Sequence, residues 1–470
     1  VGNQRGNDVF PGIQLSYADK GAAMSTSVTL KTIQSYKDKI DKEDKIKIAR
    51  NAAMRNEVTE LAMDWEHFRK IDHSFSDVIK GEMPVTNQKS SGRCWGFAGL
   101  NLFRIYLGRK HKLKDFQFSQ SYFMFWDKLE KANYFLESIL KTVDQEWNSR
   151  LVMHLLADPI QDGGQWDMWV NLINKYGVVP QSEMPESFQS SKSRRMNRMI
   201  TRKLRENAKQ LRDLKQGGAG NDELQVLKIK MLEVVFRLLV VHLGTPPASF
   251  NWQVRDKDKN FHRFENLSPV SFYKDHVELD LNDYVCLINC PMSDKQYNQV
   301  YTVEFLGNVM EGLPIRYLNV ESDVMKKAAV KAIKNDDPVW FGCDVSKHFH
   351  RGLGVMDMDL FDFNLFYGTE FGLDKASRLE YGDSQMTHAM LFTGVDLDAN
   401  GNPTKWRVEN SWGDKAGDKG YHIMTDDWFD EYNYEVVVHK SCLDDKLAEL
   451  YETAEAVPLK PWDPMGALAR

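Results

Sequence analysis

The sequence is poor in cysteine, in net positive charge and in long apolar runs. Its five cysteines are scattered over 470 residues and none forms a C-x-x-C pair, which excludes a disulfide-stapled secreted scaffold and favours a reducing compartment. The longest apolar stretch, residues 231–243, is interrupted by charged residues and is too short to span a bilayer. No apolar signal segment appears near residue 1. We therefore expect a cytoplasmic protein without a membrane-spanning segment.

The charge balance excludes a general attraction to nucleic acid or acidic lipid. Lys and Arg number 61 against 67 Asp and Glu, a formal net charge of −6. One segment departs from this average, because residues 192–216 carry ten basic and two acidic residues on a helical pattern. This basic helix could bind nucleic acid. A solvated face or a contact with an acidic surface of another subunit is the more common role of such a run, and it is the interpretation we favour.

A loop rich in helix-breaking residues leads into a helical pattern at Cys94. Residues 84–93 contain Pro, Asn, Ser and Gly, and from Trp95 onward apolar residues recur at helical spacing. Cys94 is thus predicted in the first turn of a helix, with Ser91 as its N-cap. A helix N-terminus and a nearby imidazolium lower the pKa of a thiol, so Cys94 is the candidate nucleophile. The other four cysteines are expected to pack as small apolar side chains.

A partner histidine is predicted from strand pairing. Residues 386–395 and 404–413 alternate as strands around the turn 398–401, which would place His388 and Asn410 opposite each other or one step apart. Asn410 would then orient the His388 ring. Trp412 lies on the same strand face and would cover the pair from water.

An oxyanion donor is also assignable from the loop that precedes the nucleophile. Gln88 lies six residues before Cys94, so its side-chain amide, together with the Cys94 backbone N–H, could donate to a developing oxyanion. Nucleophile, base, orienting residue and oxyanion donor are therefore all present.

In their order along the chain these motifs resemble the papain-like cysteine peptidases, and among them the bleomycin hydrolase (aminopeptidase C) branch. The resemblance rests on five segments that are spread over most of the chain beyond about residue 80: 84–95 around Cys94, 162–164 (Asp-Gly-Gly), 386–390 around His388, 407–413 around Asn410, and the terminal 461–469. It implies an α+β, papain-like two-lobed fold, with a helical lobe, a β-barrel-like lobe and a large, mainly helical insertion.

The resemblance also implies a division of the chain. The predicted parts are an N-terminal helical extension (1–83), a helical lobe with the nucleophile (84–190), an insertion for oligomerisation (191–335), a β-rich lobe with His388 and Asn410 (336–445) and a C-terminal tail in the active-site cleft (446–470). Papain-type enzymes separate Cys and His by ~130–150 residues, so roughly 150 extra residues lie between Cys94 and His388 here.

The family further implies residue roles and partners. Cys94, His388, Asn410 and Gln88 would be catalytic; Gly163, Gly164 and Trp412 would contact substrate, and the tail residues Ala469 and Arg470 would meet its free amine. The substrates would be peptides and aminoacyl amides, including bleomycin-like amides. Arg470 corresponds to a residue that relatives can trim. A homohexamer is implied, and neither a metal nor another cofactor is expected.

Two differences from secreted papain-type enzymes concern their disulfide. Its two positions hold Ser91 and Gln161 here, as a cytosolic member requires. Two other functions stay open from the sequence: a nucleic-acid-binding role through residues 192–216, and a papain-fold acyltransferase, which would add an amine in preference to water. The first predicts binding that falls steeply with salt and depends on the arginines of the basic helix.

Overall fold

The structure, a computed structural model, describes residues 26–469 and divides them into two compact units. Unit 1 comprises the described residues up to Met63 together with Asp362–Phe371, and unit 2 comprises Asp64–Phe361 and the residues from Gly372 onward. Unit 1 is helical, with α1 (Leu30–Ile40), α2 (Asp44–Ala53), α3 (Val58–Ala62) and α14 (Phe363–Tyr367).

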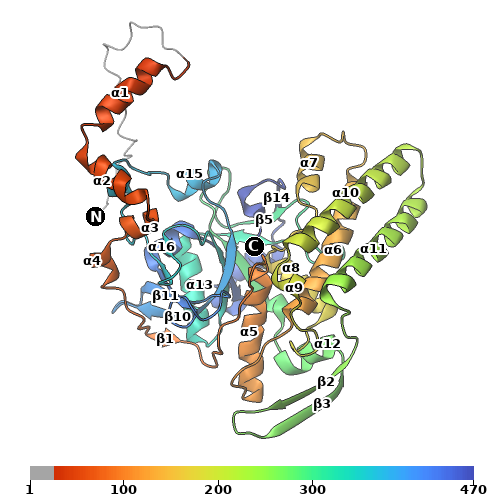
Figure 1. The fold of residues 1–470 in the computed structure, drawn as a ribbon. Coiled ribbons are helices and arrows are strands. Elements are labelled where there is room, and N and C mark those ends of the chain that lie inside the picture. The colour runs from red at the N-terminus through yellow and green to blue at the C-terminus, as the bar shows by residue number, and fades with distance from the viewer. Residues whose placement is uncertain (1–25, 470) are drawn as a thin grey trace. The chain divides into compact units, whose positions relative to one another are not determined.

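Unit 2 has a helical part that contains the predicted nucleophile (Figure 1). Its helices up to the middle of the chain are α4 (Trp65–Phe68), α5 (Cys94–His111), α6 (Gln120–Lys141), α7 (Arg150–Ala157), α8 (Trp166–Tyr176), α9 (Phe188–Ser191), α10 (Arg194–Gln216), α11 (Asn221–Leu243) and α12 (Pro269–Phe272). Helices α13 (Ser322–Lys334), α15 (Lys375–Glu380), α16 (Asp426–Tyr432) and α17 (Asp445–Thr453) follow among the strands. No helix in residues 26–469 is both long and apolar enough to cross a membrane.

One large mixed sheet forms the second part of unit 2, in the order β14-β5-β6-β4-β13-β7-β10-β11-β12-β9-β8 with β1 added on β10. Its strands are β1 (Asp77–Val78), β4 (Tyr284–Ile288), β5 (Gln299–Val303), β6 (Tyr317–Asn319), β7 (Val339–Cys343), β8 (Phe349–His350), β9 (Val355–Met356), β10 (His388–Leu397), β11 (Pro403–Glu409), β12 (Tyr421–Thr425), β13 (Asn433–His439) and β14 (Val457–Leu459). Strands β2 (Phe250–Arg255) and β3 (Phe261–Leu267) form a separate hairpin.

The sheet takes in part of the segment predicted as an insertion. Strands β4, β5 and β6 lie between residues 284 and 319 and join the same sheet as β7 and β10. What projects as a separate feature is the hairpin of α10 and α11, which packs on α6 (Figure 1). Its buried residues recur at helical spacing on α10, from Met196 and Ile200 to Leu204 and Leu211, as expected for an amphipathic helix.

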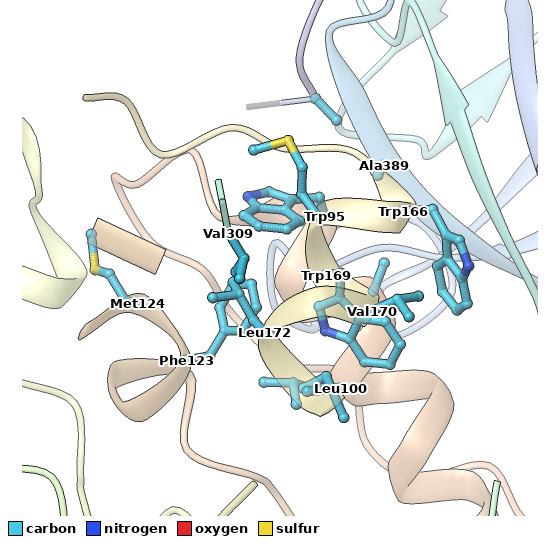
Figure 2. Close-up of a cluster of buried hydrophobic side chains, with 14 of the residues drawn as sticks. Trp95, Leu100, Phe123, Met124, Trp166, Trp169, Val170, Leu172, Val309 and Ala389 are labelled. Carbon is cyan, nitrogen blue, oxygen red and sulfur yellow. The ribbon is translucent and has the colours of Figure 1, made fainter. Parts of the chain in front are cut away.

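Helix α5 is buried along most of its length because it lies between the other helices and the sheet. Glycines let its neighbours approach closely: a Cβ on Gly96 would lie 2.2 Å from the ring of Phe123, and one on Gly99 would lie 2.3 Å from the ring of Trp169. Figure 2 shows Trp95 of this helix together with aromatic side chains of its neighbours, Phe123 and Trp169. Close packing of this kind fixes the position of the helix start.

The predicted N-cap of α5 is wrong. The cap residue is Arg93, which makes no side-chain cap hydrogen bond. Ser91 Oγ instead donates to the carbonyl of Gln88 at 2.7 Å and accepts from Arg93 Nε at 2.9 Å. Ser91 therefore stabilises the loop before the helix, and it is not available to the first turn.

The predicted register of β10 and β11 is also wrong. Leu391 pairs with Glu409 and Phe392 with Val408, so continuing the ladder sets His388 opposite Trp412 and diagonal to Asn410. The difference arises at the turn, where Leu397 pairs with Pro403, because the two irregularities along the ladder, between Asp396 and Leu397 and between Phe392 and Gly394, offset each other. Because a diagonal neighbour on one sheet face is within reach of long side chains, the shift preserves the predicted contact.

Candidate active site

Cys94 is the first residue of α5 and is fully buried. Its sulfur accepts backbone hydrogen bonds from Ala389 of β10 and from Trp95, so helix and sheet meet at the thiol. Burial raises the pKa of the Cys94 thiol to about 12, and these backbone N–H groups oppose that rise. The thiol thus lies next to the strand that carries His388.

His388 is held by Asn410 and covered by Trp412. The imidazole Nε2 lies 3.0 Å from Asn410 Oδ1, and the rings of His388 and Trp412 are 4.8 Å apart. With Asn410 Oδ1 accepting, Nε2 carries the hydrogen and Nδ1 is the basic nitrogen. Burial lowers the pKa of His388 to about 4, the bond to Asn410 opposes this, and the charge of Arg351 lowers it further.

Gln88 is fixed beside both catalytic segments. Its backbone N–H donates to the Ser411 carbonyl at 2.8 Å, and its side-chain Oε1 accepts from Ser411 Oγ at 2.6 Å. Its Nε2 donates one hydrogen to the carbonyl of Ser91 at 2.7 Å. An amide nitrogen has two hydrogens, so Gln88 retains a second for another acceptor.

The Gly163-Gly164 loop contacts the tail of the same chain. The Gly164 N–H donates to the carbonyl of Ala469 at 3.1 Å as part of an antiparallel bridge, and Gln165 Nε2 donates to the carbonyl of Ala467 at 2.5 Å. A Cβ at Gly164 would lie 2.5 Å from the indole of Trp95, so only glycine lets this backbone lie against the residue that follows Cys94. Ala469 is fully buried there, whereas Arg470 lies outside the described residues.

A buried charge network that the sequence analysis missed holds this loop. Lys128 Nζ lies 2.7 Å from Asp162 Oδ1, and Lys131 Nζ donates to Asp127 Oδ2 at 2.8 Å and to the Gly163 carbonyl at 2.6 Å. Asp162 Oδ2 accepts from the Gly92 N–H at 3.0 Å, and the charge of Lys128 helps to hold the pKa of Asp162 well below its usual value against the effect of burial. The sequence offered one signal for this network, because Lys128 and Lys131 lie three residues apart in an otherwise largely apolar helix.

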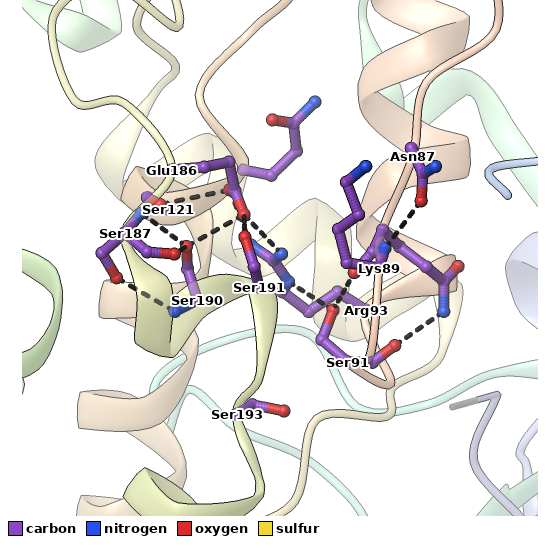
Figure 3. Close-up of polar contacts among 12 residues, drawn as sticks. Asn87, Lys89, Ser91, Arg93, Ser121, Glu186, Ser187, Ser190, Ser191 and Ser193 are labelled. Carbon is purple, nitrogen blue, oxygen red and sulfur yellow. Dashed lines mark hydrogen bonds and ion pairs between the residues drawn. The ribbon is translucent and has the colours of Figure 1, made fainter. Parts of the chain in front are cut away.

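The Asp162 network links the two loops that hold Ser91 and Gln161, the residues at the former disulfide positions. Arg93, also buried, ties the Ser91 loop to the segment before α9, with bonds of 2.9 and 2.7 Å to the two carboxylate oxygens of Glu186 (Figure 3). Bidentate charged pairs of this kind fix geometry as well as contribute energy. All five cysteines are free, so polar contacts do here what a disulfide would do elsewhere.

The arrangement suits acyl transfer through a thiol. A sulfur at a helix N-terminus, a histidine with a fixed tautomer and a nearby amide donor are the three groups that such chemistry needs. Residues 26–469 contain no cluster of three or more His, Cys, Asp or Glu side chains that could hold a metal ion. A helical part and a sheet that meet at Cys94 and His388 define a cysteine peptidase of papain-like fold.

Comparisons with known proteins extend this class to a family. The profile of the Peptidase C1-like family matches residues 27–466. Aminopeptidase C of Listeria innocua is 45% identical over 95% of this chain and 100% of its own length, and human bleomycin hydrolase is 41% identical over 95% and 99%. The crystal structure of PepW from Lactobacillus rhamnosis is 44% identical, with a TM-score of 0.93 over 95% of this chain and 100% of that one. The chain belongs to the Peptidase C1-like family and is a cysteine peptidase of the aminopeptidase C and bleomycin hydrolase type.

We expect a broad pH profile from the two buried candidate groups, Cys94 and His388. The active pair holds one proton, on sulfur or on imidazole. Burial lowers the pKa of His388 to about 4, so it opposes the binding of a second proton to the pair. Burial also raises the pKa of Cys94 to about 12, so it opposes the loss of the one proton that the pair holds. Alkylation of Cys94 by iodoacetamide, which has no titrating group, should be constant between about pH 6 and 8 and should fall by half only near pH 4 to 5. A half-maximal rate at pH 6.5 or above would contradict this.

Proposed function

We propose that the chain is a cytoplasmic aminopeptidase that releases N-terminal residues from peptides and aminoacyl amides and also deamidates bleomycin-like amides. The names of its relatives support the reaction class. The restriction to the N-terminus is supported by the pairing of Gly164 with Ala469. Through this pairing, the chain's own tail occupies the loop beside Cys94. The five free thiols favour a reducing compartment.

The proposed reaction is acyl transfer through a thioester. Cys94 Sγ attacks the carbonyl carbon of the first residue, and His388 takes the thiol proton and gives it to the leaving amine. Gln88 Nε2 and the Cys94 N–H donate to the oxyanion. Water then attacks the thioester, His388 accepts its proton, and the proton returns to sulfur as the amino acid leaves. Asn410 holds the imidazole ring of His388 throughout, and Trp412 covers the hydrogen bond between Asn410 and His388.

The tail is proposed to set the N-terminal specificity. With Ala469 buried against Gly164, a substrate cannot extend past its first residue along this loop. The terminal carboxylate, on Arg470 or on Ala469 after trimming, would bind the free α-amine of the substrate. Gly163 and Gly164 then contact substrate only to the extent that the tail leaves them accessible.

Shortening the tail should change the cleavage pattern. The full chain is expected to release single residues only, and N-acetylation of a peptide should lower its kcat/KM about 10- to 100-fold through loss of a charge-assisted bond. A chain that lacks residues 466–470 should cleave at internal bonds of the free peptide and of its N-acetylated form. Mass spectrometry of the products measures where each peptide is cut. The iodoacetamide rate of Cys94 is the control for an intact site. Single-residue release by the shortened chain would show that the tail does not set the specificity.

We further propose that the chain assembles as a homohexamer, through the hairpin of α10 and α11. Helix α11 supports self-association because it exposes Val226, Ile229 and Val241, which are 53%, 64% and 74% accessible. Apolar side chains gathered on one exposed helix are typical of an interaction surface. Light scattering on the native protein measures the assembly, and a monomer would contradict the proposal.

A further inference from the structure

The basic residues of α10 fall into two groups with different surroundings. From Lys203 onward, Lys203 pairs with Glu206 and Lys209 with Asp213, and the arginines there donate to backbone carbonyls. In its first half the arginines are all exposed, and none makes a hydrogen bond or ion pair with any residue between 26 and 469: these are Arg194, Arg195, Arg198 and Arg202. Four unpaired guanidinium groups on two adjacent turns form a strongly positive surface.

The start of α10 is fixed to the loops of the active site. The Ser90 N–H donates to the carbonyl of Ser191 at 3.0 Å, and the Arg93–Glu186 pair holds the segment that precedes the helix (Figure 3). Within α10, Asn197 Nδ2 donates to Asp162 Oδ1 at 2.7 Å. The backbone that carries the unpaired arginines therefore has a set position beside the loop that ends at Cys94.

A groove connects the active-site loops to these arginines. A cavity of about 580 Å³ is lined by residues 89–92, by residues between 158 and 162 and by the first two turns of α10, with Lys89, Arg194 and Arg198 as its cations. A second cavity of about 420 Å³ adjoins it, shares Arg198 and Thr201, and adds Arg195, Arg202 and Arg205. We name the two together the basic groove.

The acidic residues of the basic groove do not balance its cations. Asp162 is buried and paired with Lys128, so its charge is already matched, and Asp158 is the other carboxylate in the wall. The arginines face a site with few anions, and each guanidinium group is planar and presents several N–H donors in a fixed arrangement. Carboxylates match that fork and are bound by two parallel hydrogen bonds.

We propose that the basic groove binds the carboxylate side chains of acidic peptide substrates and gives the enzyme a preference for them, an inference that rests on the proposed aminopeptidase activity. A peptide is the occupant to expect because the groove begins at Gly92, two residues before the nucleophile, so a chain held at Cys94 has direct access to it. Its volume also suits a few side chains better than a long polymer.

Binding to the Cys94→Ala protein tests the groove without requiring turnover. Three peptides of equal length are compared, which differ only in carrying two glutamates, two glutamines or two lysines in the first three residues. At low salt the glutamate peptide should bind about tenfold more tightly than the glutamine peptide, and 0.5 M NaCl should remove most of the difference by screening. Equal binding of the glutamate and glutamine peptides at low salt would overturn the proposal.

A charge-matched pair of variants locates the effect. Arg194→Gln with Arg198→Gln removes two unpaired cations, whereas Lys203→Gln with Lys209→Gln removes two paired ones from the same helix. Only the first pair should abolish the preference for glutamate, as a rise in KM with kcat unchanged in the Cys94 enzyme. Turnover of the glutamine peptide, which reports the aminopeptidase itself, should be the same in both. Equal preference in the two double variants would overturn the proposal.

A polynucleotide is the other anion that these arginines could bind. A 20-nucleotide single strand at 150 mM salt should compete with the glutamate peptide weakly or not at all. Tight binding of the strand that requires Arg194 and Arg198, without any preference for acidic peptides, would assign the groove to nucleic acid and overturn the proposal.

Discussion

Replacing Cys94 with alanine is expected to lower kcat/KM for an aminoacyl amide by about 10⁴-fold or more, because the proposed thioester forms on its sulfur. Cys94 lies at the junction of α5 and β10, where the backbone N–H of Ala389 donates to its sulfur. His388 is the residue before Ala389 on the same strand. Alanine removes the sulfur without enlarging a buried side chain, so the fold should be retained. Steady-state kinetics with a chromogenic aminoacyl amide measures the loss.

The matched control is Cys343→Ala, which removes a second fully buried thiol from strand β7. Cys343 pairs in the sheet with His388 and carries no assigned role, so its loss should affect kcat/KM less than tenfold. A Cys94→Ala enzyme that keeps the turnover of the unmodified chain would remove Cys94 as the nucleophile.

Replacing Glu409 with alanine should destabilise the fold by about 3–5 kcal/mol, because it leaves a buried guanidinium unpaired. Arg104 Nη2 lies 2.5 Å from Glu409 Oε1, and both side chains are almost completely buried. Arg104 Nη1 also donates to the Pro84 carbonyl at 2.7 Å, so one guanidinium joins α5, the loop toward Gln88 and the strand end before Asn410. Chemical denaturation followed by tryptophan fluorescence measures the change.

A double variant separates loss of the charge pair from loss of packing. Arg104→Met with Glu409→Leu replaces both charges by apolar side chains of similar size, and such replacements of a buried ion pair are often neutral or stabilising. It should therefore be more stable than Glu409→Ala alone. Its kcat should still fall, because Asn410 loses a fixed neighbour. Equal stability of Glu409→Ala and the unmodified chain would show that the pair contributes nothing.

The candidate catalytic residues could be named from the sequence because each lies in a local pattern. Cys94 follows a loop of helix breakers, and His388 and Asn410 lie on two alternating strands around one turn. Local spacing predicted that these two side chains meet, although the turn pairs Leu397 with Pro403 and thereby makes the contact diagonal. The family and its fold follow from the same motifs, which the comparisons confirm.

The contacts that fix the site join residues far apart along the chain, and no local pattern predicts them. Arg104 and Glu409 are separated by 305 positions, and Gln165 and Ala467 by 302. Asp162 showed only a loop motif in the sequence, yet in the fold it bonds to Gly92 and to α10. The sequence by itself determined which groups are proposed for the chemistry, because side-chain identity and local periodicity can be read along the chain. Only the tertiary structure decided which contacts hold these groups, which atoms bind the tail and which arginines of α10 bond to no other residue between 26 and 469, because partners at such distances are selected by packing and burial.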